Sequence, residues 1–271
     1  MLDLYHHGSS VCAAKVRIAL FEKQLEWSGH YVDILTGEQF EQDYLKINPK
    51  GVVPTLVHDG RIIPESTVIC EYLEAAFGGN RLFPDDPYAK TRIRLWTKAV
   101  DEDLHPACAA VTFMISHRHT VARLGAQGTE DFLSATPALS VTADWSTLKR
   151  LYIEMGLEAP GGADKIRLYD LYLHKMEDAL NEHEWLVGDD YSIADASLTP
   201  YVNRLAMMQM SGMWKNGRLP GVTAWFDRVR ARESFQSAVL DWVPEQLTDD
   251  FRNNGAKSWP EVAKVMGIQE G

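Results

Sequence analysis

The feature that most restricts the fold is an abrupt change in hydrophobic spacing near residue 80. Before it, short apolar segments alternate as in strands or step as in helices. After it, apolar residues recur almost only at intervals of three and four, as on one face of a helix. The segment between them, Gly78–Pro87, has the most loop-like composition in the first half of the chain. The sequence therefore predicts two domains of different class, at residues 1–79 and 88–271.

The first domain has the pattern of an α/β unit. Leu2–Tyr5 alternates like a strand, and Gly8-Ser9-Ser10 separates it from a stretch with helical spacing. Asp59-Gly60 is a two-residue connection that suits a hairpin. The predicted order is βαβ-α-ββα: a strand at 2–5, a helix over 11–25, a strand at 31–34, a short helix at 39–46, strands at 52–58 and 61–63, and a helix from 66 to 76 capped by Ser66.

The second domain is predicted to be all helical. Apolar spacing indicates helices over 93–104, 166–180 and 193–208. Ser192 and Asp195 have the spacing of a capping box at the start of the last of these. Residues 117–164 contain several glycines and prolines, which indicates shorter helices joined by loops, as in an insertion.

Composition excludes several classes of partner. Lys and Arg number 27 against 38 Asp and Glu, so the net charge is −11. Such a field opposes binding to nucleic acid or to anionic lipid. The longest apolar stretch, 107–115, is far shorter than the roughly 20 residues that span a bilayer. We expect neither a nucleic acid nor a membrane as partner.

The cysteines indicate a reducing compartment. Cys12, Cys70 and Cys108 are odd in number and widely spaced, which favours neither a disulfide framework nor a zinc ribbon. The amino terminus carries Asp3 where a secretory signal would carry positive charge. We therefore expect a cytoplasmic protein.

Four segments taken together resemble the glutathione transferase family: Gly8-Ser9-Ser10-x-Cys12, Ile47-Asn48-Pro49-x-Gly51-x-Val53-Pro54, Glu65-Ser66 and Ser192-x-x-Asp195. The resemblance covers most of the chain and is weakest over residues 117–164. It implies a thioredoxin-like first domain, an all-helical second domain and glutathione as the cofactor. The stretches Glu65–Glu74 and Trp96–Glu102 look most like the bacterial β-etherase branch, whose members cleave aryl ethers with glutathione.

The resemblance implies that glutathione attacks an electrophile through sulfur, so the site must lower a thiol pKa. Lowering it by about two units requires about 2.7 kcal/mol, which one hydroxyl donor and a helix amino terminus can supply. Ser9 and Ser10 lie between the first strand and the first helix. The spacing to Lys15-Val16 favours Ser10, whereas the spacing to Cys12 favours Ser9. We predict Ser10 as the sulfur contact; either serine could instead simply cap the helix.

Cys12 is the competing catalytic residue. A thiol at the start of a helix is acidified and could form a mixed disulfide with glutathione, as in the family's cysteine-type branches. The alternative interpretation is a small buried helix residue. The sequence also departs from the β-etherases, since an ungapped comparison puts their serine at Ala13. In that register backbone amides do more of the work of holding the sulfur.

The resemblance also assigns groups that hold glutathione. Pro54 corresponds to the family's cis-proline, where the Val53 backbone pairs with the cysteinyl amide of glutathione. Glu65 and Ser66 precede a helix whose amides suit the γ-glutamyl carboxylate, with the Ser66 hydroxyl as a second donor.

Three further polar residues have weaker assignments. Gln39 aligns with a family position that binds the glycyl end, and Lys50 is a cation suited to that carboxylate. Both could equally be solvated surface. Asp101 could reach glutathione bound to a partner subunit, or be an ordinary exposed helix acid.

The electrophile is expected between the loop at 5–12 and the segment at 105–113. The residues predicted to line this pocket are His7, Phe113, Met114 and Tyr201. The histidine pairs His6-His7 and His117-x-His119 do not converge on one ion, because neighbouring strand residues diverge, as do helix residues two apart. We therefore predict no metal.

The sequence thus predicts a cytoplasmic, homodimeric glutathione transferase acting on a small, hydrophobic, aromatic electrophile. Cleavage of a β-aryl ether is the favoured specialisation. One alternative is a glutathione-dependent thiol oxidoreductase that uses Cys12. Another is a binding protein that retains glutathione or a hydrophobic ligand without turnover, because a fold does not fix a function.

Overall fold

The first part of the chain forms a mixed sheet with its first strand in the interior. The computed structural model, which describes residues 1–268, gives the strand order β2-β1-β3-β4. The first strand pairs in parallel with the second and antiparallel with the third, and the third pairs antiparallel with the fourth. The strands are β1 (Leu2–His6), β2 (Ser28–Tyr31), β3 (Thr55–His58) and β4 (Arg61–Pro64).

Helices of this part follow the predicted order βαβ-α-ββα, and the thioredoxin-like fold class is confirmed. They are α1 (Val11–Glu22), the 3-10 turn η1 (Glu38–Phe40), α2 (Gln42–Ile47) and α3 (Ser66–Ala76). Asp59 and Gly60 both have positive φ angles, 48° and 79°, as the predicted tight hairpin between β3 and β4 requires.

Two local predictions were wrong. The second strand was expected at 31–34 but lies at 28–31, where all four side chains are exposed. It is an edge strand, so hydrophobic alternation cannot reveal it. Ser66 was expected to cap α3, but it is the first helical residue. Glu65 occupies the cap position, with φ 69°, and makes no side-chain cap hydrogen bond.

The second part of the chain contains only helices and turns among residues 77–268, apart from one isolated bridge between Trp185 and Gly188. The all-helical class is therefore confirmed. Residues 77–86 have no helix or strand; the division at 1–79 and 88–271 stays a prediction. The elements are α4 (Pro87–Ala99), η2 (Val100–Leu104), α5 (His105–Thr112), η3 (Phe113–His117), α6 (Arg118–Ala122), α7 (Gly125–Ser134), α8 (Trp145–Met155), η4 (Gly156–Glu158), α9 (Gly162–Leu180), α10 (Ile193–Met207), η5 (Ser211–Met213), α11 (Pro220–Arg230), α12 (Glu233–Ala238), η6 (Leu240–Trp242) and α13 (Glu245–Val265).

The segment from 87 to 122 is one continuous helical run with two π-helical turns, η2 and η3. Pro106 is the second residue of α5, directly after the first π turn. A proline has no N–H and crowds the preceding turn, and a wider turn accommodates it. The run therefore passes through Pro106. Its π turns bring Asp101 and Phe113 to the side that faces the first part of the chain, where both line cavities.

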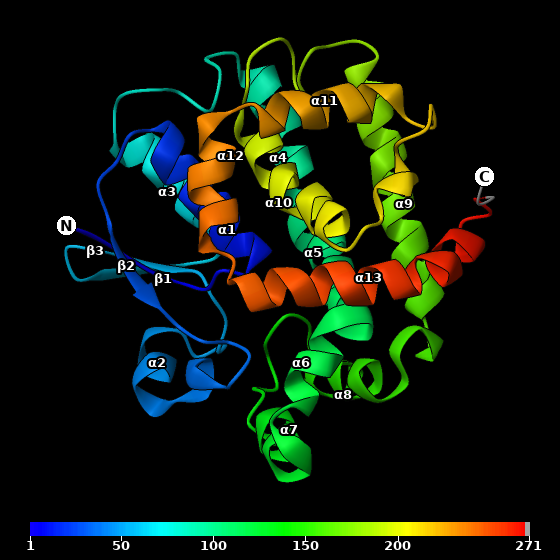
Figure 1. Cartoon of the computed structure of the whole chain (residues 1–271). Helices are drawn as coiled ribbons and strands as arrows, with labels where there is room; N and C mark the ends of the chain where they lie inside the picture. The colour runs from blue at the N-terminus through cyan, green and yellow to red at the C-terminus, as the bar shows by residue number, and fades with distance from the viewer. Residues whose placement is uncertain (269–271) are drawn as a thin grey trace.

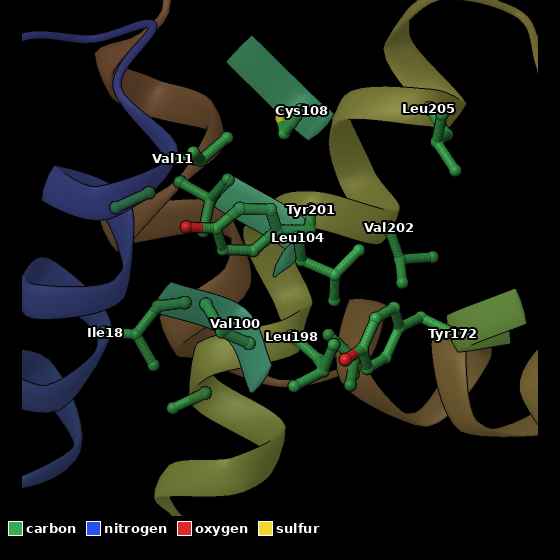
Figure 2. Packing of buried hydrophobic residues seen from close by; sticks show 14 of the residues in the cluster. Val11, Ile18, Val100, Leu104, Cys108, Tyr172, Leu198, Tyr201, Val202 and Leu205 are labelled. Atoms are coloured by element: carbon green, nitrogen blue, oxygen red, sulfur yellow. The ribbon is translucent and has the colours of Figure 1, made fainter. Parts of the chain in front are cut away.

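The hydrophobic core is continuous across both parts. Figure 2 shows side chains from three helical segments packed in one cluster: Val11 and Ile18 of α1, Val100 and Leu104 of the helical run, and Leu198 and Tyr201 of α10. Because α1 packs against α10 and α12 as well as against α3, nearly all of its side chains are buried. This packing fixes the amino-terminal end of α1 against the helical part.

Residues 117–164 form the shorter helices that the sequence indicates. In Figure 1 helices α6, α7 and α8 lie together below α13, and α2 lies below the sheet in the same lower part of the picture. The rings of Phe132 in α7 and Phe40 in η1 have centroids 5.9 Å apart. The segment therefore contacts the first part of the chain. None of the helices in residues 1–268 has the length and apolar character that crossing a bilayer demands.

The predicted capping box at the start of α10 is confirmed, and it extends into the core. The Asp195 carboxylate is buried and accepts hydrogen bonds from the Ser192 N–H and hydroxyl, both at 3.1 Å. It also accepts from the Leu186 N–H at 3.0 Å and from the Trp225 indole at 2.9 Å. One side chain thus satisfies donors from three segments.

Replacing Asp195 by Ala should lower the free energy of unfolding by about 3 kcal/mol, because it leaves several buried donors without an acceptor. Ser192→Ala removes one cap and should cost only about 1 kcal/mol. Urea denaturation followed by tryptophan fluorescence measures both. Equal losses for the two variants would contradict a role for Asp195 beyond helix capping.

Candidate active site

Two adjoining cavities lie where α1, the loop before β3, α3 and the helical run meet. The first, here called the polar cavity, has a volume of about 210 Å³ and is lined by Cys12, Lys50, Pro54, Glu65, Ser66 and Asp101. The second, here called the aromatic cavity, has a volume of about 130 Å³ and is walled by Phe40, Phe113, Phe132 and Trp145. Both are also lined by Val52, Val53, His105, Ser140 and Val141.

The polar cavity contains most of the residues predicted to hold glutathione. The peptide bond between Val53 and Pro54 is cis, as predicted. The Val53 carbonyl accepts a hydrogen bond from the Ser10 hydroxyl at 3.3 Å. Gln39 lies elsewhere, in the wall of the aromatic cavity, where its amide donates to the Ile34 carbonyl at 3.0 Å.

Helix α3 presents its amino terminus at the polar cavity. The N–H groups of Ser66, Thr67 and Val68 have no hydrogen-bond acceptor among residues 1–268, as expected for a first helical turn. The Lys50 ammonium lies 2.6 Å from a Glu65 carboxylate oxygen. Free amides beside a lysine are donors suited to a carboxylate. The residues present therefore fit an anionic peptide such as glutathione.

The two candidate serines both have engaged hydroxyls. Ser10 is the N-cap of α1: its oxygen accepts from the Ala13 N–H at 3.1 Å, while its proton is directed to Val53. The Ser9 hydroxyl lies 3.1 Å from Nδ1 of His7. The N–H groups of Val11 and Cys12 have no acceptor among residues 1–268.

Cys12 makes contacts across the two parts of the chain. Its sulfur lies 3.4 Å from Nδ1 of His105 and 3.5 Å from the Tyr201 hydroxyl. Burial would raise the pKa of the Cys12 thiol, but the charge and hydrogen bond of His105, helped by Lys15 and Tyr201, lower it to about 7. Conversely, burial would lower the pKa of His105, and the adjacent thiolate raises it. The pair therefore favours a thiolate beside an imidazolium.

Lys15 connects this thiol to α3 and the helical run. Its ammonium is buried and donates to the Thr67 hydroxyl at 2.7 Å and to Asp101 at 3.2 Å. Thr67 in turn donates to Asp101 at 3.0 Å. The Asp101 carboxylate thus faces the polar cavity and balances a buried cation.

Of the four residues predicted to line the electrophile pocket, the structure brings Phe113 to the wall of the aromatic cavity. The other three are buried behind it. His7 stacks obliquely on Tyr31, with ring centroids 5.0 Å apart, and Tyr201 points its hydroxyl at Cys12 and His105. Met114, in the η3 turn, is buried in the helical core.

Two charged residues of the aromatic cavity, Lys149 and Arg204, were not predicted from the sequence. His105 begins the segment expected at 105–113, but its contact with Cys12 was not predicted. Lys149 follows Trp145 by four positions and precedes Tyr152 by three, so it falls on the buried face of α8. Arg204 follows Tyr201 by three on the buried helix α10. A basic residue on an apolar helix face is the signal that identifies both. His105 has no such signal, because its partner Cys12 is 93 residues away.

No cluster of three His, Cys, Asp or Glu side chains with the arrangement of a metal site occurs within residues 1–268.

Comparison with known proteins identifies the family to which this architecture belongs. The sequence profile of the glutathione S-transferase N-terminal domain matches residues 4–81, and that of the C-terminal domain matches residues 169–228. The chain is 30% identical over 242 residues to protein LigF of Sphingobium sp. strain SYK-6, covering 87% of this chain and 91% of the relative. The solved structure of the beta-etherase LigF matches with a TM-score of 0.79 at 29% identity, over 89% of this chain and 99% of that one.

Two other relatives widen the comparison. Tetrachloro-p-hydroquinone reductive dehalogenase of Sphingobium chlorophenolicum is 30% identical over 251 residues, covering 88% of this chain and 95% of the relative. A maleylacetoacetate isomerase of Methylobacterium extorquens AM1, solved with malonate and glutathione bound, shares the fold, with a TM-score of 0.66 at 24% identity over 89% of this chain and 98% of that one.

Alkylation of Cys12 by iodoacetamide should have its pH midpoint near 7, and His105→Gln should raise that midpoint. Removing the cation slows alkylation at pH 7 roughly tenfold, because most of the thiol is then protonated. Mass spectrometry of the labelled peptide follows the rate. Burial raises the pKa of both other thiols, to about 12 for Cys70, so they should stay unlabelled.

His119→Gln serves as the matched control, since His119 lies on α6, outside both cavities. An unshifted midpoint in His105→Gln would show that the imidazole does not hold the thiolate.

Proposed function

The chain belongs to the glutathione S-transferase family, and we propose that it transfers glutathione to a small, hydrophobic, aromatic electrophile. The observation that carries the proposal is the junction of the two cavities. The polar cavity offers free amides and a cation, the aromatic cavity offers ring-lined apolar walls, and both meet at Val53 and His105. Nucleophile and electrophile would therefore lie in adjoining spaces.

Glutathione would be held mainly by backbone groups. The Val53 backbone before Pro54 is placed to pair with its peptide portion. The amino terminus of α3 and the Ser66 hydroxyl suit one carboxylate, and Lys50 suits the other. Lys50 is bonded to Glu65, so a second carboxylate there would have to share or displace that contact.

When bound, glutathione supplies a thiol whose ionised form is the nucleophile. The groups of this chain that favour ionisation are the free N–H groups of Val11 and Cys12 in the first turn of α1. Ser10 and Ser9 would add a hydroxyl donor only by releasing Val53 or His7. A helix amino terminus contributes up to about 2 kcal/mol and a bond to a charged group about 1.5–3 kcal/mol. Together they cover the roughly 2.7 kcal/mol that two pKa units require.

The finer proposal is cleavage of a β-aryl ether by glutathione, and the similarity to the beta-etherase LigF over most of both chains supports it. In such a reaction the sulfur forms a new bond to a carbon next to a carbonyl. The bond between that same carbon and the ether oxygen breaks, and the oxygen stays on the aryl ring. The electron pair leaves with a phenolate, which departs without prior protonation. The chain therefore needs no general acid at the leaving oxygen.

Protein mixed with glutathione and a β-aryl ether ketone should release free phenol together with an equimolar glutathione thioether. Chromatography quantifies both products. Ser66→Ala should raise the KM for glutathione about tenfold, the value of a hydrogen bond to a charged group, and leave kcat within a few fold.

A second substrate and a binding test distinguish the ether specialisation, the general transferase activity and binding without turnover. Turnover of 1-chloro-2,4-dinitrobenzene without phenol release would remove the ether specialisation and keep the transferase. Capture of the protein on immobilised glutathione without turnover of either compound would indicate a binding protein instead.

The contact between Cys12 and His105 supports a second candidate, a glutathione-dependent thiol oxidoreductase. Here the Cys12 thiolate attacks a disulfide, forms a mixed disulfide with one half of it and expels the other half as a thiol. One glutathione then displaces the first half as a second thiol, leaving a disulfide between Cys12 and glutathione, and a second glutathione attacks that disulfide to give oxidised glutathione and the free Cys12 thiol. Each exchange balances, because one disulfide replaces another.

Cys12→Ser should abolish reduction of hydroxyethyl disulfide by glutathione and leave conjugation of 1-chloro-2,4-dinitrobenzene within about threefold of the wild type. Absorbance assays follow both reactions. Cys70→Ser, a change in a buried thiol outside both cavities, is the matched control. If Cys12→Ser lost both activities to the same extent, both reactions would depend on Cys12, which would contradict the proposal that conjugation proceeds without it.

We also propose a homodimer in the cytoplasm. Large apolar side chains are exposed on neighbouring helices, Val68 on α3 and Tyr88 and Leu95 on α4, as on surfaces that associate. All three cysteines are free thiols, which suits a reducing compartment.

A further inference from the structure

A buried lysine without a carboxylate partner lies in the wall of the aromatic cavity. Lys149 of α8 is only 2% exposed, and no carboxylate of residues 1–268 lies within 4.0 Å of its ammonium. Its nitrogen instead faces three rings, with centroids at 3.7 Å for Phe132, 5.2 Å for Phe40 and 5.8 Å for Phe113. Lysines on protein surfaces usually extend their ammonium to water. This one is enclosed.

The protein satisfies only part of the hydrogen-bonding capacity of the Lys149 ammonium. The Lys149 ammonium donates to the Thr136 hydroxyl at 2.7 Å, and Thr136 passes its own proton to the Phe132 carbonyl at 3.2 Å. An ammonium carries three donors, so two remain without an oxygen acceptor among residues 1–268. Burial disfavours the charged form of Lys149 and lowers its pKa to about 7.

The cavity as a whole is basic. Arg204 also lines it, and none of its lining residues is an aspartate or glutamate. The lining His117 adds no charge, because burial holds the pKa of its imidazole well below its ordinary value. The Arg204 guanidinium is buried, donates to the Ser9 carbonyl and to the Thr112 hydroxyl, and leaves its Nε without a partner. In a chain of net charge −11, a cavity with cations and no acid does not follow from composition.

The size of the cavity limits what fits. A cavity of roughly 150 Å³ lined by apolar side chains holds one benzene ring, and the aromatic cavity measures about 130 Å³. Phe113, Phe132 and Trp145 supply the ring-lined walls. The space therefore suits a single aromatic ring rather than a fused system.

We propose that the aromatic cavity binds a single aromatic ring that carries an ionised oxygen, and that Lys149 determines this specificity. The inference deepens the proposed function by giving the electrophile an anionic ring. A phenolate and an aryl carboxylate share this chemistry. Lys149, Thr136 and Phe132 all belong to residues 117–164, so this segment contributes the ammonium that would recognise the ionised oxygen.

Binding of 4-nitrophenol tests the proposal, because its ionised form is yellow and its neutral form is not. In the absence of glutathione, at the pH where the free phenol is half ionised, the bound phenol should be predominantly ionised. Lys149→Met and Lys149→Gln should return the bound spectrum to that in water and weaken binding about tenfold or more, the value of a bond between charged groups. 4-Nitroanisole, which cannot ionise, should bind the wild type and both variants within about threefold.

Lys264→Met is the matched control, since it removes one positive charge from an exposed position on α13. It should bind 4-nitrophenol as the wild type does. Binding of 4-nitrobenzoate, lost in the same two variants, would assign the carboxylate; its failure beside tight phenolate binding would assign the phenolate.

Thermal unfolding separates a binding role from a structural one. Removing a buried ammonium that lacks a counter-ion should leave the unfolding temperature of Lys149→Met unchanged or higher. The proposal is overturned if the wild type binds 4-nitrophenol no better than 4-nitroanisole, or if folded variants keep the wild-type preference. Conjugation of 1-chloro-2,4-dinitrobenzene is measured separately: its absence would refute the transferase while leaving the anion site intact.

Discussion

Helix α1 is enclosed by the sheet, α3, α10 and α12, and the candidate site is built around its first turn. This packing brings the Cys12 sulfur to His105 and Tyr201 and places the Ser10 hydroxyl on the Val53 carbonyl. A helix that is exposed on one side has room to shift by a small distance. A helix buried on nearly all sides cannot, because interiors are close-packed. The geometry of the thiol chemistry is therefore a consequence of core packing across both parts of the chain.

Charge is distributed in opposite ways on the surface and in the cavities. The chain is acidic as a whole, yet Lys149 and Arg204 lie buried in the wall of the aromatic cavity, and Lys15 lies buried beside the polar one with Asp101 as its partner. Burying a charge without a counter-ion is unfavourable by several kcal/mol even after the protein relaxes around it. Arrangements of this kind are usual where binding or catalysis, rather than stability, has selected the residue. The two unpaired cations belong to the cavity that lies beside the thiol.

The fold was predictable to the extent that it depends on local periodicity. The alternation in β1, the Asp59-Gly60 hairpin and the capping box of Ser192 and Asp195 each involve residues close in sequence. The edge strand β2 was misplaced because its exposed side chains carry no alternating signal. Motifs predicted Val53, Pro54 and Ser66 as glutathione contacts, and all three line the polar cavity. The wall of the aromatic cavity was less predictable, because it includes Phe113 but not His7, Met114 or Tyr201.

The sequence alone determined the two fold classes and the family, because both depend on motifs and apolar spacings of a few residues. Only the tertiary structure decided which groups surround the Cys12 thiol and which side chains line the aromatic cavity. Cys12 and His105 are 93 residues apart, and Phe40 and Lys149 come from opposite parts of the chain. Their contacts arise from how helices pack, and the pKa values that follow depend on burial and on charges within a few ångströms. Neither these contacts nor the resulting pKa shifts exist until the chain is folded.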